Sequence, residues 1–231
     1  MSELYIVGTP IGNLGDITYR ALETLRSVDV VAAEDTRHTL QLLNHFEIRK
    51  PLISCRAQNE ESASQKIIAL LDEGQTVAYA SDAGTPGISD PGSVLAARAR
   101  AAGHRVVPIP GPSAFATLAS VAGEGGKTLV FEGFLSPKPG RRRARVRELM
   151  EGGNSFILYE SPFRIVKLLG DIADIDSERR VVIGRELTKL HEEISEGTAK
   201  QVLDDYSSRA KVQGELAVFV SGLKKVQVSD E

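Results

Sequence analysis

The stretch SDAGTPGISDPG at residues 81–92 decides the fold. The apolar run VAYA at residues 77–80 leads into it, and an alanine-rich helical pattern at residues 94–102 follows it. This order predicts a strand, a loop and a helix. The loop holds three glycines, two prolines and two aspartates, so we expect an exposed backbone with unusual conformations.

Two interpretations of this loop are open. Loops at the carboxyl ends of strands are the places where open α/β sheets bind ligands. The alternative is a plain turn before a helix that is capped by Ser89 or Asp90, with Pro91 in its first position. Two similar loops favour the ligand site, because residues 8–15 and residues 110–114 also follow short apolar runs.

Composition and charge describe an ordinary soluble protein. The chain has 231 residues, of which 42% are hydrophobic and 26% charged, enough for one large or two small domains. Its net charge of −3 means that a nucleic acid, if the chain binds one, would have to meet a local basic patch. The single cysteine, Cys55, excludes an intramolecular disulfide, and the four histidines lack metal-ligand spacing, so we expect no metal. No signal peptide or membrane span is recognisable, and we expect a cytoplasmic protein.

The first half has the pattern of an α/β protein. Asp16 is expected to cap a helix whose apolar residues lie on one face, and Ala63, Ile67 and Leu71 mark another helix. Neither a dinucleotide fingerprint nor a P-loop is present. We predict a mostly parallel, doubly wound sheet whose strands lie at residues 4–7, 30–33, 52–54, 77–80 and 106–109.

The second half has a different pattern. Residues 122–126, AGEGG, are the best candidate for a link, which predicts an N-terminal α/β domain at 1–121 and a C-terminal domain at 122–231. Beyond the link, strand-like runs alternate with fewer and weaker helices, which predicts a mixed sheet. The expected strands lie at residues 128–131, 155–159, 180–183 and 215–220.

Several long motifs resemble one family. They are VGTPIGNL at 7–14, AEDTR at 33–37, the loop at 81–92, YESP at 159–162 with Arg164, and RELTK at 185–189. In this order they resemble the bacterial 2′-O-ribose methyltransferases of 16S ribosomal RNA, a branch of the tetrapyrrole methylase superfamily. The resemblance runs from Leu4 to Val220. It implies two α/β domains, S-adenosylmethionine as cofactor, a homodimer, and methylation of the ribose of a cytidine in the decoding centre of the small ribosomal subunit.

The resemblance also implies a cofactor site between the two halves. Tight turns with few side chains suit the polar groups of this cofactor, and small apolar residues suit its adenine. For Ser113 the alternative is a helix N-cap, and for Tyr159 it is a half-buried strand aromatic. The expected cofactor residues are Pro10, Asp82, Gly84, Thr85, Ile88, Ser113, Ala114 and Tyr159.

Three carboxylates are candidates for the base that takes the proton of a ribose hydroxyl. Asp35, Glu160 and Glu186 each follow an apolar strand. The alternative for each is an ion pair with an arginine nearby in the sequence, namely Arg37, Arg164 and Arg185.

Residues 138–147 carry six positive charges and no acid. Clustered arginines suit phosphate oxygens, and the alternative is a solvated helix face. The expected RNA-binding residues are Lys138, Arg141, Arg142, Arg143, Arg145 and Arg147. Two rival functions are a tetrapyrrole methylase of the same superfamily and an inactive protein that binds the ribosome.

Overall fold

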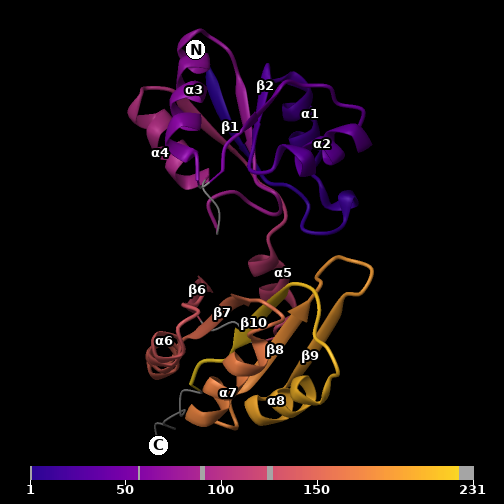
Figure 1. The fold of residues 1–231 in the computed structure, drawn as a ribbon, viewed down its shortest axis with the longest axis vertical. Helices are drawn as coiled ribbons and strands as arrows, with labels where there is room; N and C mark the ends of the chain where they lie inside the picture. Colours follow the sequence, from indigo (N-terminus) through magenta and orange to yellow (C-terminus); the bar gives the residue numbers. More distant parts are fainter. Residues whose placement is uncertain (1, 57, 89–91, 124–126, 224–231) are drawn as a thin grey trace, which may run out of the picture. The chain divides into compact units, whose positions relative to one another are not determined.

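The computed structural model describes residues 2–56, 58–88, 92–123 and 127–223. The chain divides into two compact units, Met1–Ser113 and Ala114–Glu231 (Figure 1). Helix α5 (Ala114–Val121) therefore groups with the second unit rather than the first. The predicted domains 1–121 and 122–231 stay a prediction, and residues 124–126 of the predicted link lie outside the described residues.

The first unit contains a parallel sheet of five strands in the order β3-β2-β4-β1-β5. All five lie where the apolar runs predict them, within a residue or two. Their bounds are β1 Glu3–Val7, β2 Val30–Ala33, β3 Leu52–Ser54, β4 Val77–Ala80 and β5 Arg105–Ile109. Strands β2 and β4 are buried along their whole length, because helices cover both faces of a parallel sheet.

Two helices cover each face of this sheet, as in a doubly wound fold (Figure 1). Helices α1 (Tyr19–Ser27) and α2 (Thr36–His45) share one apolar core with Val7, Val31 and Ile109. Helices α3 (Glu60–Asp72) and α4 (Gly92–Ala101) share the other core with Leu4 and Tyr79. The predicted fold class of the first half is confirmed.

The cap of the first helix differs from the prediction. Thr18, not Asp16, is the N-cap of α1, and its hydroxyl accepts a hydrogen bond from the Ala21 amide at 3.1 Å. Asp16 ends a separate short 3-10 helix, Leu14–Asp16. The two candidates for the cap of α4, Ser89 and Asp90, lie outside the described residues.

The second unit contains a mixed sheet of five strands in the order β6-β7-β10-β8-β9. Strand β6 is parallel to β7, and the last strand, β10, lies antiparallel between β7 and β8. The bounds are β6 Leu129–Phe134, β7 Ser155–Glu160, β8 Arg180–Arg185, β9 Glu193–Thr198 and β10 Leu216–Val220. The predicted mixed sheet is confirmed.

Helices cover one face of this sheet more fully than the sequence pattern suggested. Helices α6 (Pro139–Glu151), α7 (Ile165–Ile175) and α8 (Ala199–Ser208) share one core with alternate residues of β7, β8 and β10. On α5, the Phe115 ring packs edge-on against Phe131 of β6, with the ring centroids 5.1 Å apart. This contact explains why α5 groups with the second unit.

Strand β9 was not predicted. Its sequence, EISEGT, is polar because it lies at the edge of the sheet, paired only with β8. Period-2 patterns are weak where neither face of a strand is deeply buried.

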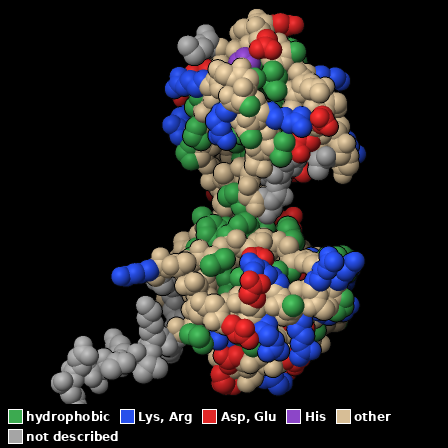
Figure 2. Space-filling view, turned by 90° about the vertical axis from the view of Figure 1, so that its left-hand side faces the viewer, with side chains coloured by type: hydrophobic (Ala, Val, Ile, Leu, Met, Phe, Trp, Pro, Cys, Tyr) green, Lys and Arg blue, Asp and Glu red, His purple; other side chains and the backbone are tan. Residues whose placement is uncertain are grey.

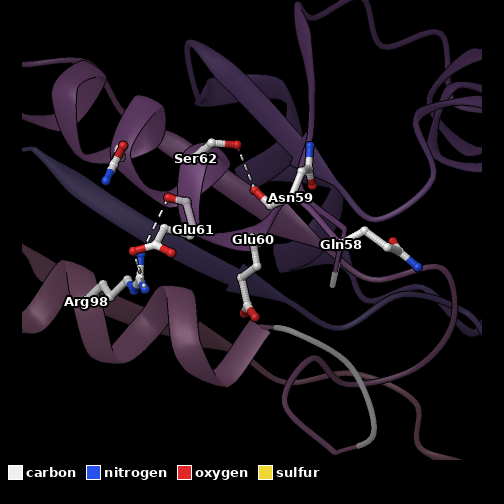
Figure 3. Close-up of a pocket in the computed structure, with 7 residues that line it drawn as sticks. Gln58, Asn59, Glu60, Glu61, Ser62 and Arg98 are labelled. Carbon is white, nitrogen blue, oxygen red and sulfur yellow. Dashed lines mark hydrogen bonds and ion pairs between the residues drawn. The ribbon is translucent and has the colours of Figure 1, made fainter.

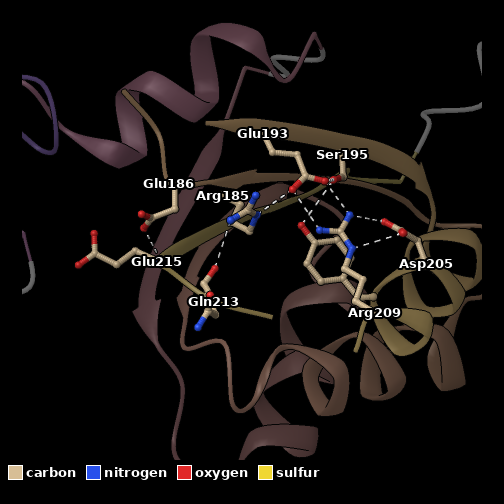
Figure 4. A network of polar contacts seen from close by, with 9 residues as sticks. Arg185, Glu186, Glu193, Ser195, Asp205, Arg209, Gln213 and Glu215 are labelled. Carbon is tan, nitrogen blue, oxygen red and sulfur yellow. Dashed lines mark hydrogen bonds and ion pairs between the residues drawn. The ribbon is translucent and has the colours of Figure 1, made fainter. Parts of the chain in front are cut away.

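A network of polar side chains joins β8, β9 and the end of α8 (Figure 4). The Glu193 carboxylate accepts hydrogen bonds from Arg185 at 2.7 Å and from Arg209 at 2.6 Å. Arg209 also binds Asp205, and its guanidinium lies 4.0 Å from the centre of the Tyr206 ring. Hydrogen bonds from Arg209, aided by Arg185, lower the pKa of Glu193 to about 2.

This pKa gives a prediction for stability against pH. A carboxyl whose pKa is lowered by folding stabilises the native state above its ordinary pKa of 4.5, and this stabilisation disappears as the pH falls through about 2. Glu193→Gln should therefore be less stable than the wild type at pH 7, and the difference should shrink between about pH 4.5 and pH 2. Urea denaturation of both proteins at pH 7, 4 and 3 measures this, and a difference that does not change with pH contradicts it.

The surface carries both signs of charge. Lysine and arginine side chains are interspersed with aspartate and glutamate over the visible face (Figure 2). Among the residues that the structure describes, no helix has the length and apolar character needed to cross a membrane.

Candidate active site

The loops after β1, β4 and β5 meet at the carboxyl edge of the first sheet. The Thr9 amide donates to the Gly84 carbonyl at 2.9 Å, and the Gly84 amide donates back to Thr9 at 3.1 Å. The Gly8 amide donates to the Ile109 carbonyl at 3.0 Å. Three of the glycine-rich loops of the sequence are thus joined by their backbones.

Two glycines allow this close approach. A Cβ atom on Gly8 would lie 2.7 Å from the Cα of Gly111, and a Cβ on Gly111 would lie 2.8 Å from the backbone of Gly8. No side chain fits at either position. The sequence did not mark out this pair of glycines. Gly8 directly follows an apolar strand and Gly111 comes two residues after one, and a proline follows each glycine within two residues.

Gly84 is held between the other two loops. Its φ is +85°, which side chains rarely adopt, and a Cβ there would lie 3.3 Å from Ile11 and 3.6 Å from the Pro112 carbonyl. The hydroxyl of Thr85 donates to the same Pro112 carbonyl at 3.0 Å. The predicted cofactor residues Gly84 and Thr85 therefore lie against the loop that carries Ser113.

Ser113 has a buried hydroxyl without a hydrogen-bond partner among the described residues. It directly precedes α5, but its Oγ accepts no amide of that helix, so the interpretation as an N-cap is wrong. A buried hydroxyl without a partner is costly, and a ligand that hydrogen-bonds to it would remove that cost. Ala114 begins α5, and Ile88 is half-buried at the end of the loop after β4.

Asp82 links the loop after β4 to the end of β2. Its Oδ1 accepts a hydrogen bond from the Asp35 amide at 2.8 Å, while its own amide faces Glu34 at 3.4 Å. This contact is consistent with a supporting role for Asp82.

Two hollows lie on the first unit. A small one of about 120 Å³ adjoins the strand ends and is lined by Thr9, Pro10, Leu14, His38, Gln41, Leu42 and Asp82. Pro10 and Asp82 are both predicted cofactor residues. A larger, polar one of about 480 Å³ lies at the amino end of α3 (Figure 3) and contains no predicted site residue; it is lined by Gln58, Asn59, Glu60, Glu61, Ser62, Gln65 and Arg98.

Asp35 is engaged in an ion pair, as the alternative interpretation expects. Its Oδ1 caps α2 by accepting the Arg37 amide at 2.9 Å, and its Oδ2 lies 2.6 Å from the Arg37 guanidinium. These contacts with Arg37 hold the pKa of Asp35 well below its ordinary value. A carboxylate so strongly stabilised in its charged form is a weak base.

Tyr159, Glu160 and Glu186 lie where strands β7 and β8 of the second sheet end. Leu216, the first residue of β10, pairs with Glu160 of β7 and with Arg185 of β8, so the ends of these strands are neighbours. The Tyr159 hydroxyl accepts the Phe115 amide at 2.9 Å, and its ring packs against Phe131. The residue is half-buried.

Glu160 is the most buried of the three carboxylates. Its side chain is 0% exposed and its Oε1 lies 2.6 Å from Arg164 and 2.7 Å from the Ser161 amide. Its Oε2 has no hydrogen-bond partner among the described residues. The predicted ion pair with Arg164 is present, and it engages only one of the two carboxylate oxygens.

Glu186 has a different partner from the one expected. It pairs with Lys189 at 2.9 Å and accepts the Glu215 amide at 2.8 Å, whereas Arg185 pairs with Glu193 (Figure 4). Burial raises its pKa, but Lys189 and the Glu215 amide outweigh burial and lower the pKa below its ordinary value. The backbone here is left-handed, with φ 51° at Glu186 and 67° at Thr188.

Helix α6 carries the predicted RNA-binding cations, and three of them have acidic partners. Arg142 is buried, and its Nε donates to Asp171 of α7 at 2.7 Å. Arg143 pairs with Asp174 at 2.8 Å, and Arg145 pairs with Glu132 and Glu148 at 2.7 Å. The geometry therefore gives Arg142 a packing role in the second unit.

The other cations of this segment are exposed. Lys138, Arg141 and Arg147 form no ion pair with the residues that the structure describes. Across the described part of the chain, no group of three or more histidine, cysteine, aspartate or glutamate side chains is placed to hold a metal ion.

Together, a doubly wound parallel sheet with joined strand-end loops and a second, mixed sheet define a two-unit α/β protein. The family model for Tetrapyrrole (Corrin/Porphyrin) Methylases matches residues 3–203. The chain belongs to this family, which confirms the resemblance seen in its motifs.

Similar sequences extend over nearly the whole chain. A protein of Borrelia garinii subsp. bavariensis named Ribosomal RNA small subunit methyltransferase I is 47% identical over 219 residues, covering 94% of this chain and 98% of its own. The protein of the same name from Thermotoga maritima is 45% identical over 222 residues, covering 96% and 99%.

Solved structures of similar fold are more distant in sequence. The methyltransferase CobJ matches with a TM-score of 0.70 at 17% identity, covering 96% of this chain and 95% of its own. The uroporphyrin-III-C-methyltransferase from Thermus thermophilus matches with a TM-score of 0.65 at 18% identity, covering 96% and 94%. At these identities the likeness supports the fold alone.

Proposed function

We propose that this chain methylates small-subunit ribosomal RNA with S-adenosylmethionine, at a ribose 2′-hydroxyl. One observation carries the proposal: relatives named Ribosomal RNA small subunit methyltransferase I match it at 45–47% identity over 94–96% of the chain. The family model of methylases agrees with this reaction class.

The strand ends of the first unit fit the proposed cofactor. Gly8, Gly84 and Gly111 leave three positions of the loops without a side chain, so backbone amides and carbonyls there can reach a polar ligand. The buried hydroxyl of Ser113 offers one hydrogen bond that no other described residue takes. The contacts of Gly84, Thr85 and Ser113 support their place in the proposed site. All eight expected cofactor residues stay predictions, namely Pro10, Asp82, Gly84, Thr85, Ile88, Ser113, Ala114 and Tyr159.

In this proposal the main role of the chain is to position the methyl donor and the acceptor hydroxyl relative to each other. When bound, S-adenosylmethionine supplies an electrophilic methyl group on its sulfonium. The joined loops after β1, β4 and β5 would fix the donor, and aligning the acceptor with it supplies much of the acceleration of a displacement reaction. Asp82 would hold the loop after β4 in place through the Asp35 amide.

When the ribose oxygen accepts the methyl group, the C–S bond would break to leave a neutral thioether, and the hydroxyl would lose its proton. Of the three candidate carboxylates, Glu160 has an oxygen without a partner, while Asp35 and Glu186 are stabilised as anions by Arg37 and Lys189. We therefore favour Glu160 as the group that accepts the proton.

This assignment predicts different effects for three amide variants. Glu160→Gln should lower the single-turnover rate of methyl transfer roughly 100-fold and leave cofactor affinity unchanged. Asp35 and Glu186 are held as anions by Arg37 and Lys189, so we expect Asp35→Asn and Glu186→Gln to lower the rate less than Glu160→Gln does. If all three variants transfer methyl groups at the wild-type rate on saturating RNA, none of them is the base.

The exposed cations predict how RNA affinity depends on salt. Arg141→Ala combined with Arg147→Ala should weaken binding to cognate and unrelated RNA alike, and each lost phosphate contact should lower the slope of log affinity against log salt by about 0.7 to 0.9. Arg143→Ala is the matched control on the same helix, because its guanidinium is paired with Asp174. Titrations at several salt concentrations measure the slopes, and an unchanged slope in the double variant contradicts RNA contact.

The proposed function is tested on ribosomal RNA itself. Ribose methylation is mapped on 16S RNA from a strain that lacks its own copy of the enzyme, with and without this chain. We expect one ribose methyl group to return only when the chain is present. Calorimetry with S-adenosylmethionine separates an active enzyme from an inactive ribosome-binding protein, since the latter need not bind the cofactor.

Three finer proposals rest on the family resemblance. They are cytidine 1402 as the target nucleotide, a homodimer, and a cytoplasmic location. A tetrapyrrole substrate is the second candidate, because the family model describes tetrapyrrole methylases and one structure of similar fold, at 18% identity, is a uroporphyrin-III-C-methyltransferase. If the chain methylates a tetrapyrrole and not RNA, the tetrapyrrole becomes the first candidate substrate.

A further inference from the structure

Two phenylalanines are exposed where strands β6 and β7 end. Phe134 is the last residue of β6 and is 59% exposed, and Phe163 follows β7 and is 84% exposed. The two strands are parallel and paired, with Phe134 opposite Tyr159. Both rings therefore lie at the same edge of the second sheet, the edge that carries Glu160.

Phe163 does not pack against helix α7, although apolar residues just before a helix N-cap usually do. It precedes Arg164, the N-cap of α7, and an apolar residue there normally packs against the fourth residue of the helix. That fourth residue, Leu168, is fully buried without it. A large aromatic ring left in water contributes nothing to the core, so a partner that covers it would gain by the burial.

The chain beneath the two rings is held firmly. Arg164 lies 2.6 Å from the buried Glu160, donates to the Leu135 carbonyl at 3.3 Å and contacts the Ser161 hydroxyl at 3.4 Å. This single guanidinium joins the segment after β6 to the segment after β7. A surface that is already ordered loses little entropy when it binds a partner.

The segments that follow β6 and β7 carry three exposed cations. Lys138 and Arg141 follow β6 at the start of α6, and Lys167 lies in the first turn of α7, which contains no acid. None of these three cations forms an ion pair with the described residues. Exposed aromatic rings among free cations are the surface that single-stranded nucleic acids bind, because the bases stack and the phosphates pair.

We propose that Phe163 and Phe134 form a stacking platform for unpaired nucleobases of the RNA substrate. The inference rests on the proposed function and deepens it, since it names the part of the substrate that these residues contact. Stacking accepts any base, so the platform would hold an unpaired strand without reading its sequence.

The test uses Phe163, because its ring packs least against the protein. The probe is an unstructured oligoribonucleotide that contains 2-aminopurine, whose fluorescence falls when it stacks. Phe163→Ala should weaken binding about 5- to 100-fold, Phe163→Trp should bind as well as the wild type, and Phe163→Leu should bind as poorly as alanine. Because no charge is removed, the salt slope should not change.

The matched control is Tyr19→Ala, a change at a tyrosine that is 89% exposed on the first unit. It should bind the oligonucleotide like the wild type, and the affinity of Phe163→Ala for a duplex of the same sequence should be unchanged. If Phe163→Ala binds the oligonucleotide like Tyr19→Ala while the wild type methylates ribosomal RNA, the platform is wrong and the proposed function stands. If the wild type methylates no ribosomal RNA at all, the proposed function itself fails.

Discussion

Gly84→Val is expected to abolish binding of S-adenosylmethionine, lowering its affinity by more than about 1,000-fold, or roughly 4 kcal/mol. A valine here meets two obstacles. Its Cβ would lie 3.3 Å from Ile11 and 3.6 Å from the Pro112 carbonyl, and its two methyl groups reach farther, so the loops after β1 and β5 must move apart. Calorimetry on the folded variant measures the loss.

The backbone conformation of Gly84 makes any substitution there lower the stability of the protein, and this effect must be separated from the loss of cofactor binding. Its φ of +85° disfavours any side chain by about 1–2 kcal/mol of stability. Gly74→Val is the matched control, because Gly74 has φ +89° with no atom within 4 Å of a Cβ, and lies before β4 rather than after it. Both variants should bear this backbone cost, and only Gly84→Val should lose the cofactor. Equal affinities in the two variants would mean that the loop after β4 does not bind it.

Arg142→Met is expected to destabilise the second unit by about 3 to 5 kcal/mol. Arg142 is 5% exposed and its partner Asp171 is 13% exposed, so the change leaves a carboxylate buried without its counter-charge. That loss is a large part of the 5–15 kcal/mol that stabilises a typical domain. Urea denaturation gives the free energy of unfolding directly.

The neighbouring residue supplies the control for this prediction. Arg143→Met removes the same charge from the same helix, but Arg143 and Asp174 are 50% and 58% exposed, and pairs in water contribute only about 0–1 kcal/mol. A destabilisation of equal size in the two variants would show that the loss comes from helix α6 itself and not from the buried pair.

The comparison of these two arginines shows what the sequence could predict of the site. A count of charges in residues 138–147 identifies a basic segment, but it does not show that Asp171 and Asp174 lie against it from a helix about thirty residues away. The same limit applies to Glu186. Its sequence neighbour Arg185 was the expected partner, and the fold instead brings Glu193 to Arg185 and Lys189 to Glu186.

The fold itself was easier to predict, where burial leaves a clear pattern. Strands β2 and β4 are apolar at every position because both of their faces are covered, and their sequences predicted them correctly. Strand β9 and the N-cap of α1 were not predicted correctly. Strand β9 lies at an edge of the sheet, so its sequence is polar and lacks the apolar pattern of a strand. At α1, Asp16 is a residue type that favours the N-cap position, but Thr18 is the residue that caps the helix.

The position of β10 has a consequence for synthesis of the chain. This strand is buried at all five positions and lies between β7 and β8, although it is the last strand in the sequence. Until residues 216–220 leave the ribosome, the pair β6–β7 and the pair β8–β9 have no strand to join them. The first sheet is complete after residue 109, so the amino-terminal unit can fold during translation, while the second unit must wait until β10 has been synthesised.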